Sequence, residues 1–153
     1  MKFLFIQFLF ITFLTSSVYA QPSEKQILIT IANDFFQALE KQDTTALHKL
    51  FMKGSSSYFV RDSEKAPVQT GVRSFTQITF KPDRVITERM RESEVIVHID
   101  GRIAVAWVPY DLWINQEFSH CGVDVFTFIK TETKWEIASI AYSMVPEGCN
   151  TKK

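Results

Sequence analysis

The sequence predicts an α+β domain in which a pair of amphipathic helices precedes a long antiparallel sheet. Three observations carry this prediction. Apolar residues recur with a helical period after Ser23, the period changes to two after Gly54, and clear turn signals divide the sequence after residue 93 into strands. One helix pair covers only one face of such a sheet. The other face must therefore meet water, a partner chain or a folded-back part of the sheet.

Residues 1–20 have the pattern of a secretory signal peptide. Lys2 supplies a positive charge, residues 3–14 are almost unbroken apolar sequence, and Val18-Tyr19-Ala20 places small residues at the cleavage positions. The alternative is a membrane anchor, which needs roughly twenty apolar residues, more than this run provides. We therefore expect cleavage after Ala20, a periplasmic or secreted protein, and a single mature domain over residues 21–153.

The predicted helices open the mature domain. Ser23 begins a capping box with Gln26, and the apolar stripe that follows predicts a helix over about residues 24–41. Asp43 can cap a second helix, for which Gly54 is a suitable end.

The strand signals before residue 93 are weak. Residues 57–61 and 85–90 are expected to be strands, and residues 62–67 a loop. Residues 71–80 are either a strand or a short helix. Lys81-Pro82-Asp83 is a break.

The strand signals after residue 93 are stronger, and they predict a meander. Its turns are expected at Asp100-Gly101, at Asn115-Gln116 and at residues 131–134. We expect a bulge or bend near Pro109, because proline cannot donate a ladder hydrogen bond. The predicted strands are residues 94–99, 102–114, 118–130 and 135–144.

These turns also predict which residues lie opposite each other in the sheet. They set His98 opposite Ile103, Trp107 opposite Asp124, and Asp124 opposite Ala141; a register slip of one residue would exchange the two faces. One predicted face mixes large aromatic, small and ionisable residues, as small-molecule pockets do. That face comprises Ile96, His98, Ile103, Val105, Trp107, His120, Gly122, Asp124, Phe126, Phe128, Ile137, Ser139, Ala141 and Ser143.

The second predicted face is uniformly small, β-branched and apolar. It is apolar enough to require a partner, and we therefore expect a homodimer through the sheet. The alternative is a monomer whose sheet bends over that face. Its members are Val95, Val97, Ala104, Ala106, Val108, Val123, Val125, Ile129, Ala138, Ile140 and Tyr142.

Asp124 is the sharpest candidate for a functional residue. It lies in the middle of a predicted strand between Val123 and Val125, where Asp is disfavoured. A carboxylate buried there must find hydrogen-bond partners or raise its pKa. The functional interpretation is a ligand anchor or a general base. The structural alternative is an Asp bonded to Trp107, to a backbone amide or to a helix residue.

Three further residues complete the predicted ligand pocket. Trp107 and Tyr110 belong to an aromatic strand whose rings either pack in the core or stack on a flat ligand. His120 precedes Asp124 by four residues, about 13 Å along a strand, which is too far for a direct acid–base pair. We expect it at the pocket rim, with a partly exposed turn histidine as the alternative.

The two cysteines, Cys121 and Cys149, favour a disulfide. Export would place them where disulfides persist. The bridge would close a loop of roughly 29 residues and stabilise the fold by about 3–4 kcal/mol. The alternative is two free thiols too far apart to meet. A nucleophilic Cys121 assisted by His120 is disfavoured, because adjacent strand residues point to opposite faces.

Charge and motifs exclude several function classes. The chain has 17 basic and 17 acidic residues, and loss of Lys2 with the signal peptide leaves 16 − 17 = −1. Without a basic stripe or a second apolar span, we expect neither nucleic-acid binding nor a membrane span in the mature chain. The three histidines lack metal-ligand spacing, and no phosphate loop occurs, so we expect neither a metal nor a cofactor.

Several segments resemble the NTF2-like (SnoaL-like) superfamily. Residues 33–51 resemble its two-helix start, residues 100–111 its central strand, and residues 118–126 and 135–137 its last two strands. Among its members, the sequence is most similar to exported bacterial proteins of the nuclear transport factor 2 family and to lumazine-binding proteins. The resemblance implies a cone, in which a strongly bent antiparallel sheet wraps around the helices, often as a dimer through the sheet.

The superfamily includes isomerases, cyclases, dehydratases and non-enzymatic binders, so three hypotheses stay open. The first is a small-molecule binder with Asp124 as a polar anchor, joined by His120 or Tyr110. The second is an enzyme of those classes with Asp124 as general base. The third is an association module that uses the apolar sheet face. A roomy pocket in which the pKa of Asp124 is raised would favour the enzyme. A roomy pocket in which Asp124 is ionised and bonded to the backbone would favour the binder. A cone filled by side chains would favour the association module.

Overall fold

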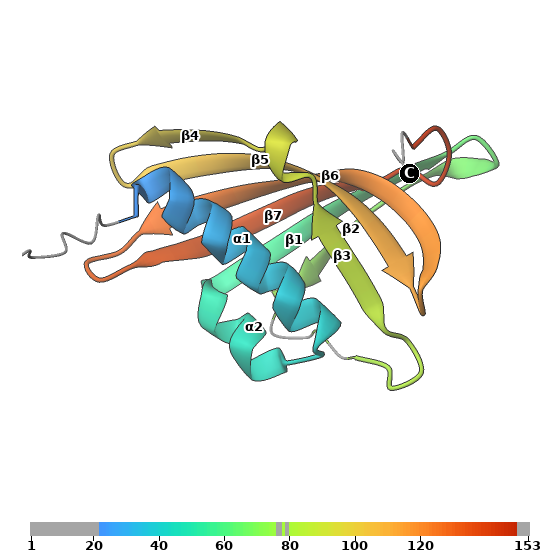
Figure 1. Ribbon diagram of the computed structural model, residues 1–153, viewed down its shortest axis with the longest axis horizontal. Helices are drawn as coiled ribbons and strands as arrows, with labels where there is room; N and C mark the ends of the chain where they lie inside the picture. Colours follow the sequence, from blue (N-terminus) through green and yellow to red (C-terminus); the bar gives the residue numbers. More distant parts are fainter. Residues whose placement is uncertain (1–21, 76–77, 79, 150–153) are drawn as a thin grey trace, which may run out of the picture.

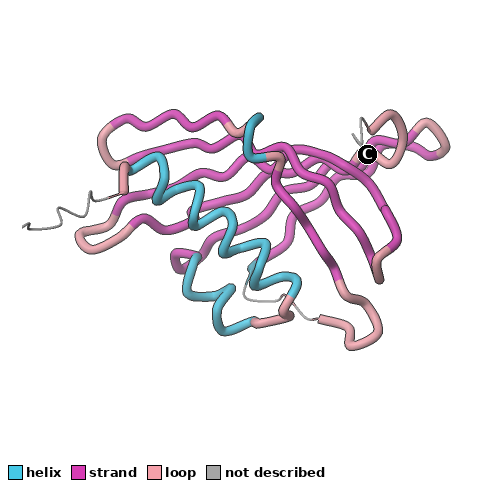
Figure 2. Tube along the Cα trace, in the orientation of Figure 1, coloured by secondary structure: helices cyan, strands magenta, loops and turns pink. Residues whose placement is uncertain are grey.

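The computed structural model describes residues 22–75, 78 and 80–149, so the predicted signal peptide over residues 1–20 lies outside the described residues. Two helices lie on one side of a curved layer of strands (Figure 2). None of the described helices has the length and apolar character needed to span a membrane. The elements are α1 (Glu24–Glu40), α2 (Thr44–Leu50), β1 (Phe51–Ser63), β2 (Ala66–Ser74), β3 (Ile86–Met90), a 3-10 turn (Glu92–Glu94), β4 (Ile96–Asp100), β5 (Ile103–Ile114), β6 (Glu117–Lys130) and β7 (Trp135–Met144).

The strands form one sheet in the order β2-β1-β7-β6-β5-β3, and β4 also pairs with β5. All pairs are antiparallel except β1 with β7, so the sheet is mixed rather than purely antiparallel. α1 lies across the concave side of the bent sheet, and α2 lies beside it (Figure 1). The predicted α+β cone is thereby confirmed.

Both helix starts follow the capping chemistry that the sequence predicts. The Ser23 hydroxyl accepts a hydrogen bond from the Gln26 amide at 3.2 Å, and the Asp43 carboxylate accepts one from the Ala46 amide at 2.8 Å. The predicted end of the second helix at Gly54 is wrong. The helix ends at Leu50, and Gly54 lies within β1 at φ +87°, where the pairing of β1 with β7 is irregular. A glycine at positive φ is as suitable for a bulge as for a helix cap.

The region that gave weak signals contains a long hairpin. β1 and β2 pair from Ser56 with Ser74 to Ser63 with Ala66, so the loop expected over residues 62–67 is wrong. Most residues of this hairpin are exposed on both faces, which removes the apolar alternation that reveals a strand. The strands expected over residues 57–61 and 85–90 are confirmed as parts of β1 and β3.

The register predicted between β4 and β5 is displaced, but the displacement moves no side chain to the other face of the sheet. Asp100 pairs with Ile103, so the β4–β5 turn is Gly101-Arg102 and lies one residue later than expected. The pairing shifts by two residues, and His98 lies opposite Val105. A shift of two leaves every side chain on its predicted face.

The registers predicted for β5–β6 and β6–β7 are correct next to the turns, but each shifts by one residue at a bulge further along the strands. Between β5 and β6, the pairing Trp113 with Phe118 follows the prediction, but an extra residue then places Asp124 opposite Val108. Between β6 and β7, a second extra residue places Asp124 opposite Tyr142 instead of Ala141. The bulges are at Ser119 and Ala138 and not near Pro109 as predicted, and each exchanges the faces beyond it.

The two bulges define the face that α1 covers. Ala104, Ala106 and Val108 are buried there beside Asp124 and Phe126, whereas the sequence predicted the opposite residues of β5. The placement of Trp107 on the pocket face is therefore wrong. Its side chain is on the convex face and is 48% exposed.

Aromatic rings join α1 to the sheet. The Phe35 ring makes edge contacts with the rings of Phe51, Phe75 and Phe126, at centroid distances of 5.5–6.4 Å. Phe51 and Phe75 stack with their centroids 3.7 Å apart. Each fully buried side chain of this size stabilises the fold by about 2–3 kcal/mol, so these rings hold the helix on the concave face.

The predicted disulfide between Cys121 and Cys149 is confirmed, with the two Cα atoms 5.8 Å apart. Backbone hydrogen bonds join Cys121 and Val145 in both directions, at 3.1 and 2.9 Å. The C-terminal segment is therefore held against β6 by covalent and hydrogen bonds, one residue from Gly122.

Gly122 permits a close approach between β6 and β7. A Cβ atom at this position would overlap the backbone oxygen of Ser143 and lie 2.9 Å from the Tyr110 ring. The same Ser143 oxygen accepts a hydrogen bond of 2.7 Å from the Tyr110 hydroxyl. The absence of a side chain at Gly122 thus allows Tyr110 to be fixed beneath the sheet.

We expect the substitution Gly122→Ala to lower the free energy of unfolding by about 3 kcal/mol, because the obstructing oxygen belongs to the backbone and cannot rotate away. Urea denaturation measures this loss. Gly101→Ala is the matched control, since it has open space and only a positive φ of 56°, which costs about 1–2 kcal/mol. Equal losses in the two variants would contradict the steric argument.

Candidate functional site

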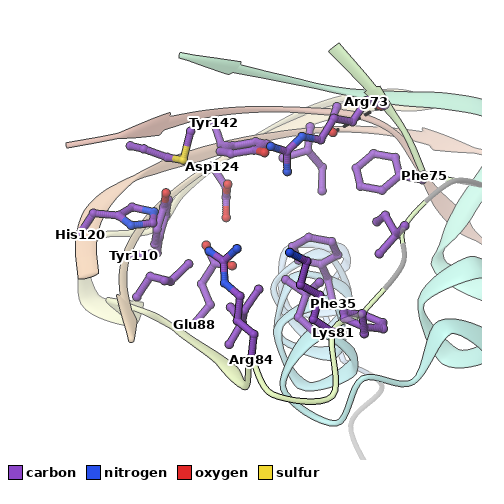
Figure 3. Close-up of a pocket in the computed structure, with 18 residues that line it drawn as sticks. Phe35, Arg73, Phe75, Lys81, Arg84, Glu88, Tyr110, His120, Asp124 and Tyr142 are labelled. Carbon is purple, nitrogen blue, oxygen red and sulfur yellow. Dashed lines mark hydrogen bonds between the residues drawn. The ribbon is translucent and has the colours of Figure 1, made fainter. Parts of the chain in front are cut away.

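A cavity of about 280 Å³ lies between α1, the β2–β3 connection and the concave face of the sheet (Figure 3). Most of its wall is apolar, and its polar groups comprise two acids, three cations, two tyrosines, a histidine and a serine. The described lining residues are Phe35, Leu39, Ser57, Arg73, Phe75, Ile78, Phe80, Lys81, Arg84, Ile86, Glu88, Tyr110, Leu112, His120, Asp124, Ile140, Tyr142 and Met144.

The acids Glu88 and Asp124 meet in this cavity from β3 and β6. Asp124 is only 3% exposed, and one of its carboxyl oxygens, Oδ2, is buried with no hydrogen-bond partner among the described residues. Each carboxyl shifts the pKa of the other, and the directions of these shifts make Glu88 the proton carrier of the pair and Asp124 its acceptor. Figure 3 shows the Asp124 carboxyl pointing toward Glu88.

Burial determines the protonation of this acid pair. Loss of solvent raises the pKa of Asp124 to about 8, although the hydrogen bond from Glu88 acts in the opposite direction. Burial, followed by the Asp124 charge and the hydrogen bond, raises the pKa of Glu88 well above its usual range. Two carboxyls in contact cannot both ionise cheaply, so the pair holds at least one proton at neutral pH. When a ligand oxygen replaces Asp124 as the partner of that proton, the pair offers the ligand a hydroxyl donor beside an oxygen acceptor.

Two aromatic residues border the acid pair. Tyr110 is 1% exposed and donates its hydroxyl proton to the Ser143 oxygen, so its ring rather than its O–H lines the cavity. Tyr142 lies opposite Asp124 in the β6–β7 ladder, with its ring centroid 6.0 Å from that of Phe59. Burial raises the pKa of both tyrosines, so both are uncharged at neutral pH.

His120 contacts Tyr110 at the same end of the cavity. The two rings meet edge to face, with centroids 5.9 Å apart, and the His120 Nδ1 atom is 3.0 Å from the Ser119 hydroxyl. Burial, with the nearby positive charges of Arg61 and Arg84, lowers the pKa of His120 to about 4. This histidine is therefore neutral at physiological pH.

The cations Arg73, Lys81 and Arg84 lie on the solvent side of the cavity, since all three residues are exposed while Asp124 is buried. The Arg73 guanidinium also lies over the Phe59 ring, 4.9 Å from its centroid. The side-chain amide of Gln42 donates hydrogen bonds to the backbone oxygens of Lys81 and Arg84, at 3.2 and 3.0 Å. The connection that carries two of the cations is thus tied to the end of α1.

The structure brings together three of the four residues predicted for the pocket. Tyr110, His120 and Asp124 line the cavity, whereas Trp107 is on the other side of the sheet. Sequence reasoning missed Glu88, which lies two residues after Ile86 and on the same face of β3. The signal that identified Asp124 was an acid flanked by two valines in mid-strand, and it is absent at Glu88, which lies between Thr87 and Arg89.

No group of three or more His, Cys, Asp or Glu that could hold a metal ion lies together in the described part of the chain. What the cavity can do chemically is surround a small apolar body, offer it a paired donor and acceptor, and move a proton at the acid pair.

Comparison with known families identifies the chain. Residues 23–143 match the family model described as "Putative lumazine-binding". The chain belongs to this family. Its NTF2-like resemblance is thereby confirmed, and no curated protein matches the sequence.

Solved structures with the same fold are distant in sequence. A cystatin-like protein of unknown function from Nostoc punctiforme is 12% identical, covers 81% of this chain and 92% of its own, and has a TM-score of 0.58. A "putative dehydratase from the NTF2-like family" of Streptomyces avermitilis is 18% identical (78% and 94% covered, TM-score 0.56). The β subunit of a "putative aromatic-ring-hydroxylating dioxygenase" from Novosphingobium aromaticivorans is 8% identical (80% and 88% covered, TM-score 0.60). At these identities the likeness shows the fold alone.

We expect the free energy of unfolding to fall as pH rises from about 6.5 to 8, by about 1.4 kcal/mol per pH unit for each proton that the pair retains. The folded-state pKa of Asp124 lies near 8, above its unfolded value, so the native state holds a proton that the unfolded chain releases. His120, whose pKa is lowered to about 4, has the opposite effect, but only below its ordinary pKa of about 6.5.

Urea denaturation across this pH window tests the expectation. The double variant Glu88→Gln/Asp124→Asn should lose the slope, while Asp100→Asn at the exposed end of β4 should retain it. A slope that is zero or positive in the wild-type protein would show that the acid pair is ionised.

Proposed function

We propose that this protein binds a small, mostly apolar organic molecule in the cavity, with the Glu88–Asp124 pair as its polar anchor. The observation that carries the proposal is the buried Asp124 Oδ2 atom, which has no hydrogen-bond partner in a cavity that is otherwise largely apolar. An unsatisfied buried oxygen of this kind costs about 1–3 kcal/mol, and a ligand that donates a hydrogen bond to it recovers that cost.

The size and chemistry of the cavity define the ligand class. Its volume of about 280 Å³ is close to the lower end of small-molecule sites, which span about 300–1000 Å³. The donor and acceptor of the acid pair fit a neutral group with adjacent N–H and C=O, such as a ring lactam or imide. The rings of Phe35, Phe75 and Tyr142 provide flat apolar walls. Lumazine, which the family description names, is a bicyclic heterocycle with such groups and is the first probe.

Proton-transfer catalysis is a second candidate, and the raised pKa of Asp124 favours it. A general base acts best when its pKa is near the working pH. Ionised Asp124 would take a proton from a carbon beside a carbonyl group, and the Glu88 hydroxyl would stabilise the resulting enolate by donating to its oxygen. Return of the proton to another carbon gives isomerisation, and departure of a hydroxide as water gives dehydration.

We also propose that the protein is a single domain exported to the periplasm or beyond. The signal pattern of residues 1–20 supports this, and the disulfide is compatible with it. Association as a homodimer through the convex face is a further part of the proposal. The exposed apolar side chains of Ile103, Val105 and Trp107 on that face support it.

Native mass spectrometry of the mature protein from its own host is the decisive experiment. We expect a reproducible small molecule that is released on denaturation, and a rise in melting temperature when lumazine is added to the ligand-free protein. Leu39→Trp should abolish both effects by filling the cavity, whereas Val105→Trp on the convex face should leave them unchanged. A ligand-free species from the host, with no response to the probe, would instead favour the association module.

Asp124→Asn separates the two candidate functions. In a binder, the variant changes affinity and nothing else. In an enzyme, it retains measurable binding of the released molecule but does not convert it, which mass spectrometry of the incubated ligand detects.

A further inference from the structure

The charges that line the cavity are unevenly distributed in a chain whose total charge is balanced. Three cations, Arg73, Lys81 and Arg84, are among its lining residues. The Glu88–Asp124 pair holds at least one proton and so contributes at most one negative charge, and His120 is neutral. The lining therefore carries a net charge of at least 3 − 1 = +2, whereas the whole chain has 17 basic and 17 acidic residues.

None of these three cations has a carboxylate within ion-pair distance among the described residues. Other cations of the same chain are paired, as Arg91 with Glu94 and Asp111, and Arg102 with Glu132 show. The remaining residues also contain no Asp or Glu that could pair with these three cations. They are residues 1–21, 76, 77, 79 and 150–153. The cavity thus concentrates positive charge that no carboxylate of the described residues pairs with.

The three cations are positioned rather than scattered. Figure 3 shows the side chains of Arg73, Lys81 and Arg84 directed from different sides toward the space that the Asp124 carboxyl also faces. Hydrogen bonds from Gln42 hold the backbone at Lys81 and Arg84. The side-chain amide of Asn115 donates to the Asp83 oxygen at 3.0 Å and accepts from the Val85 amide at 2.9 Å, so the Arg84 segment is fixed on both sides.

We propose that the ligand is an organic oxyanion whose neutral polar end meets the Glu88–Asp124 pair and whose carboxylate or phosphate lies among Arg73, Lys81 and Arg84. This inference rests on the proposed function and defines the class of molecule that the cavity takes. Guanidinium groups match the planar, two-oxygen geometry of carboxylate and phosphate. The unpartnered, buried Asp124 oxygen is the second observation, because it requires a donor at the opposite end of the same molecule.

The two ends of the cavity also determine the orientation of such a ligand. An anionic group at the acid pair would face a buried oxygen that is an acceptor, which is unfavourable without a proton. The same group among the three cations gains attraction in a partly enclosed site. The ligand therefore enters with its neutral end first, and cationic molecules are disfavoured by the positive lining.

Isothermal titration of ligand-free protein with four naphthalene probes tests this inference. The probes share one ring system and differ in charge: 2-naphthamide, 2-naphthoate, 2-naphthyl phosphate and 2-naphthylmethylamine. At a pH near 6.5, we expect one or both anions to bind about tenfold or more tightly than the amide, and the amine most weakly. The preference for the anions should shrink between about 0.02 M and 0.5 M salt, because salt screens exposed charges.

Charge variants separate the inference from the proposed function. Arg84→Gln and Lys81→Gln should weaken binding of the preferred anion about tenfold and leave the amide unchanged. Arg102→Gln is the matched control, since it removes the same charge from the β4–β5 turn, outside the cavity, and should alter neither affinity.

Each outcome is decisive. If the amide or the amine binds as tightly as both anions, the oxyanion inference is wrong while small-molecule binding stands. The same conclusion follows if Arg102→Gln weakens anion binding as much as Arg84→Gln does. If no probe binds, the oxyanion inference is wrong, and if the host protein also carries no ligand, the proposed function is wrong as well.

Discussion

One extra residue in each of two neighbouring strands determines which side chains face α1. The bulges at Ser119 and Ala138 rotate the strands that follow them, so that Asp124 lies between Val108 and Tyr142 in the ladders and lines the cavity. Gly122 then allows β7 to approach closely enough for Tyr110 to bond to Ser143. The cavity, its acid pair and its aromatic border all depend on these local shifts of register.

The acid pair is a destabilising feature that the fold retains. A carboxyl with a pKa near 8 and an unpartnered oxygen costs free energy that an apolar pair of similar volume would not. Carboxyls with strongly shifted pKa values concentrate at functional sites, where a destabilising group is retained because binding or catalysis needs it. The phenylalanine cluster around Phe35, which holds α1 against the sheet, offsets this cost at the other side of the cavity.

The cavity bears on all three functional hypotheses. A cone filled by side chains would have favoured an association module, but space of about 280 Å³ remains beside Asp124. The raised pKa of Asp124 meets the condition for an enzyme, while the apolar wall and the unpaired cations are equally suited to a binder. The exposed convex face leaves association through the sheet as an additional property rather than a rival, because it uses the opposite side of the same strands.

The sequence by itself determined the features that are encoded within a few residues. Helix caps at Ser23 and Asp43, the strands after residue 93 and the suspicion that Asp124 is buried all follow from local hydrogen bonds and periodicity. The disulfide follows from two cysteines and an inferred compartment.

Only the tertiary structure decided which residues share the site. Glu88 and Asp124 are brought together through β5, and the cations come from strands and connections whose order in the sheet has no local signal. The error at Trp107 has the same origin, since side chains alternate with a period of two and one bulge exchanges the faces. A pKa likewise depends on burial and on neighbours distant in sequence, so the protonated acid pair became evident only in the folded chain.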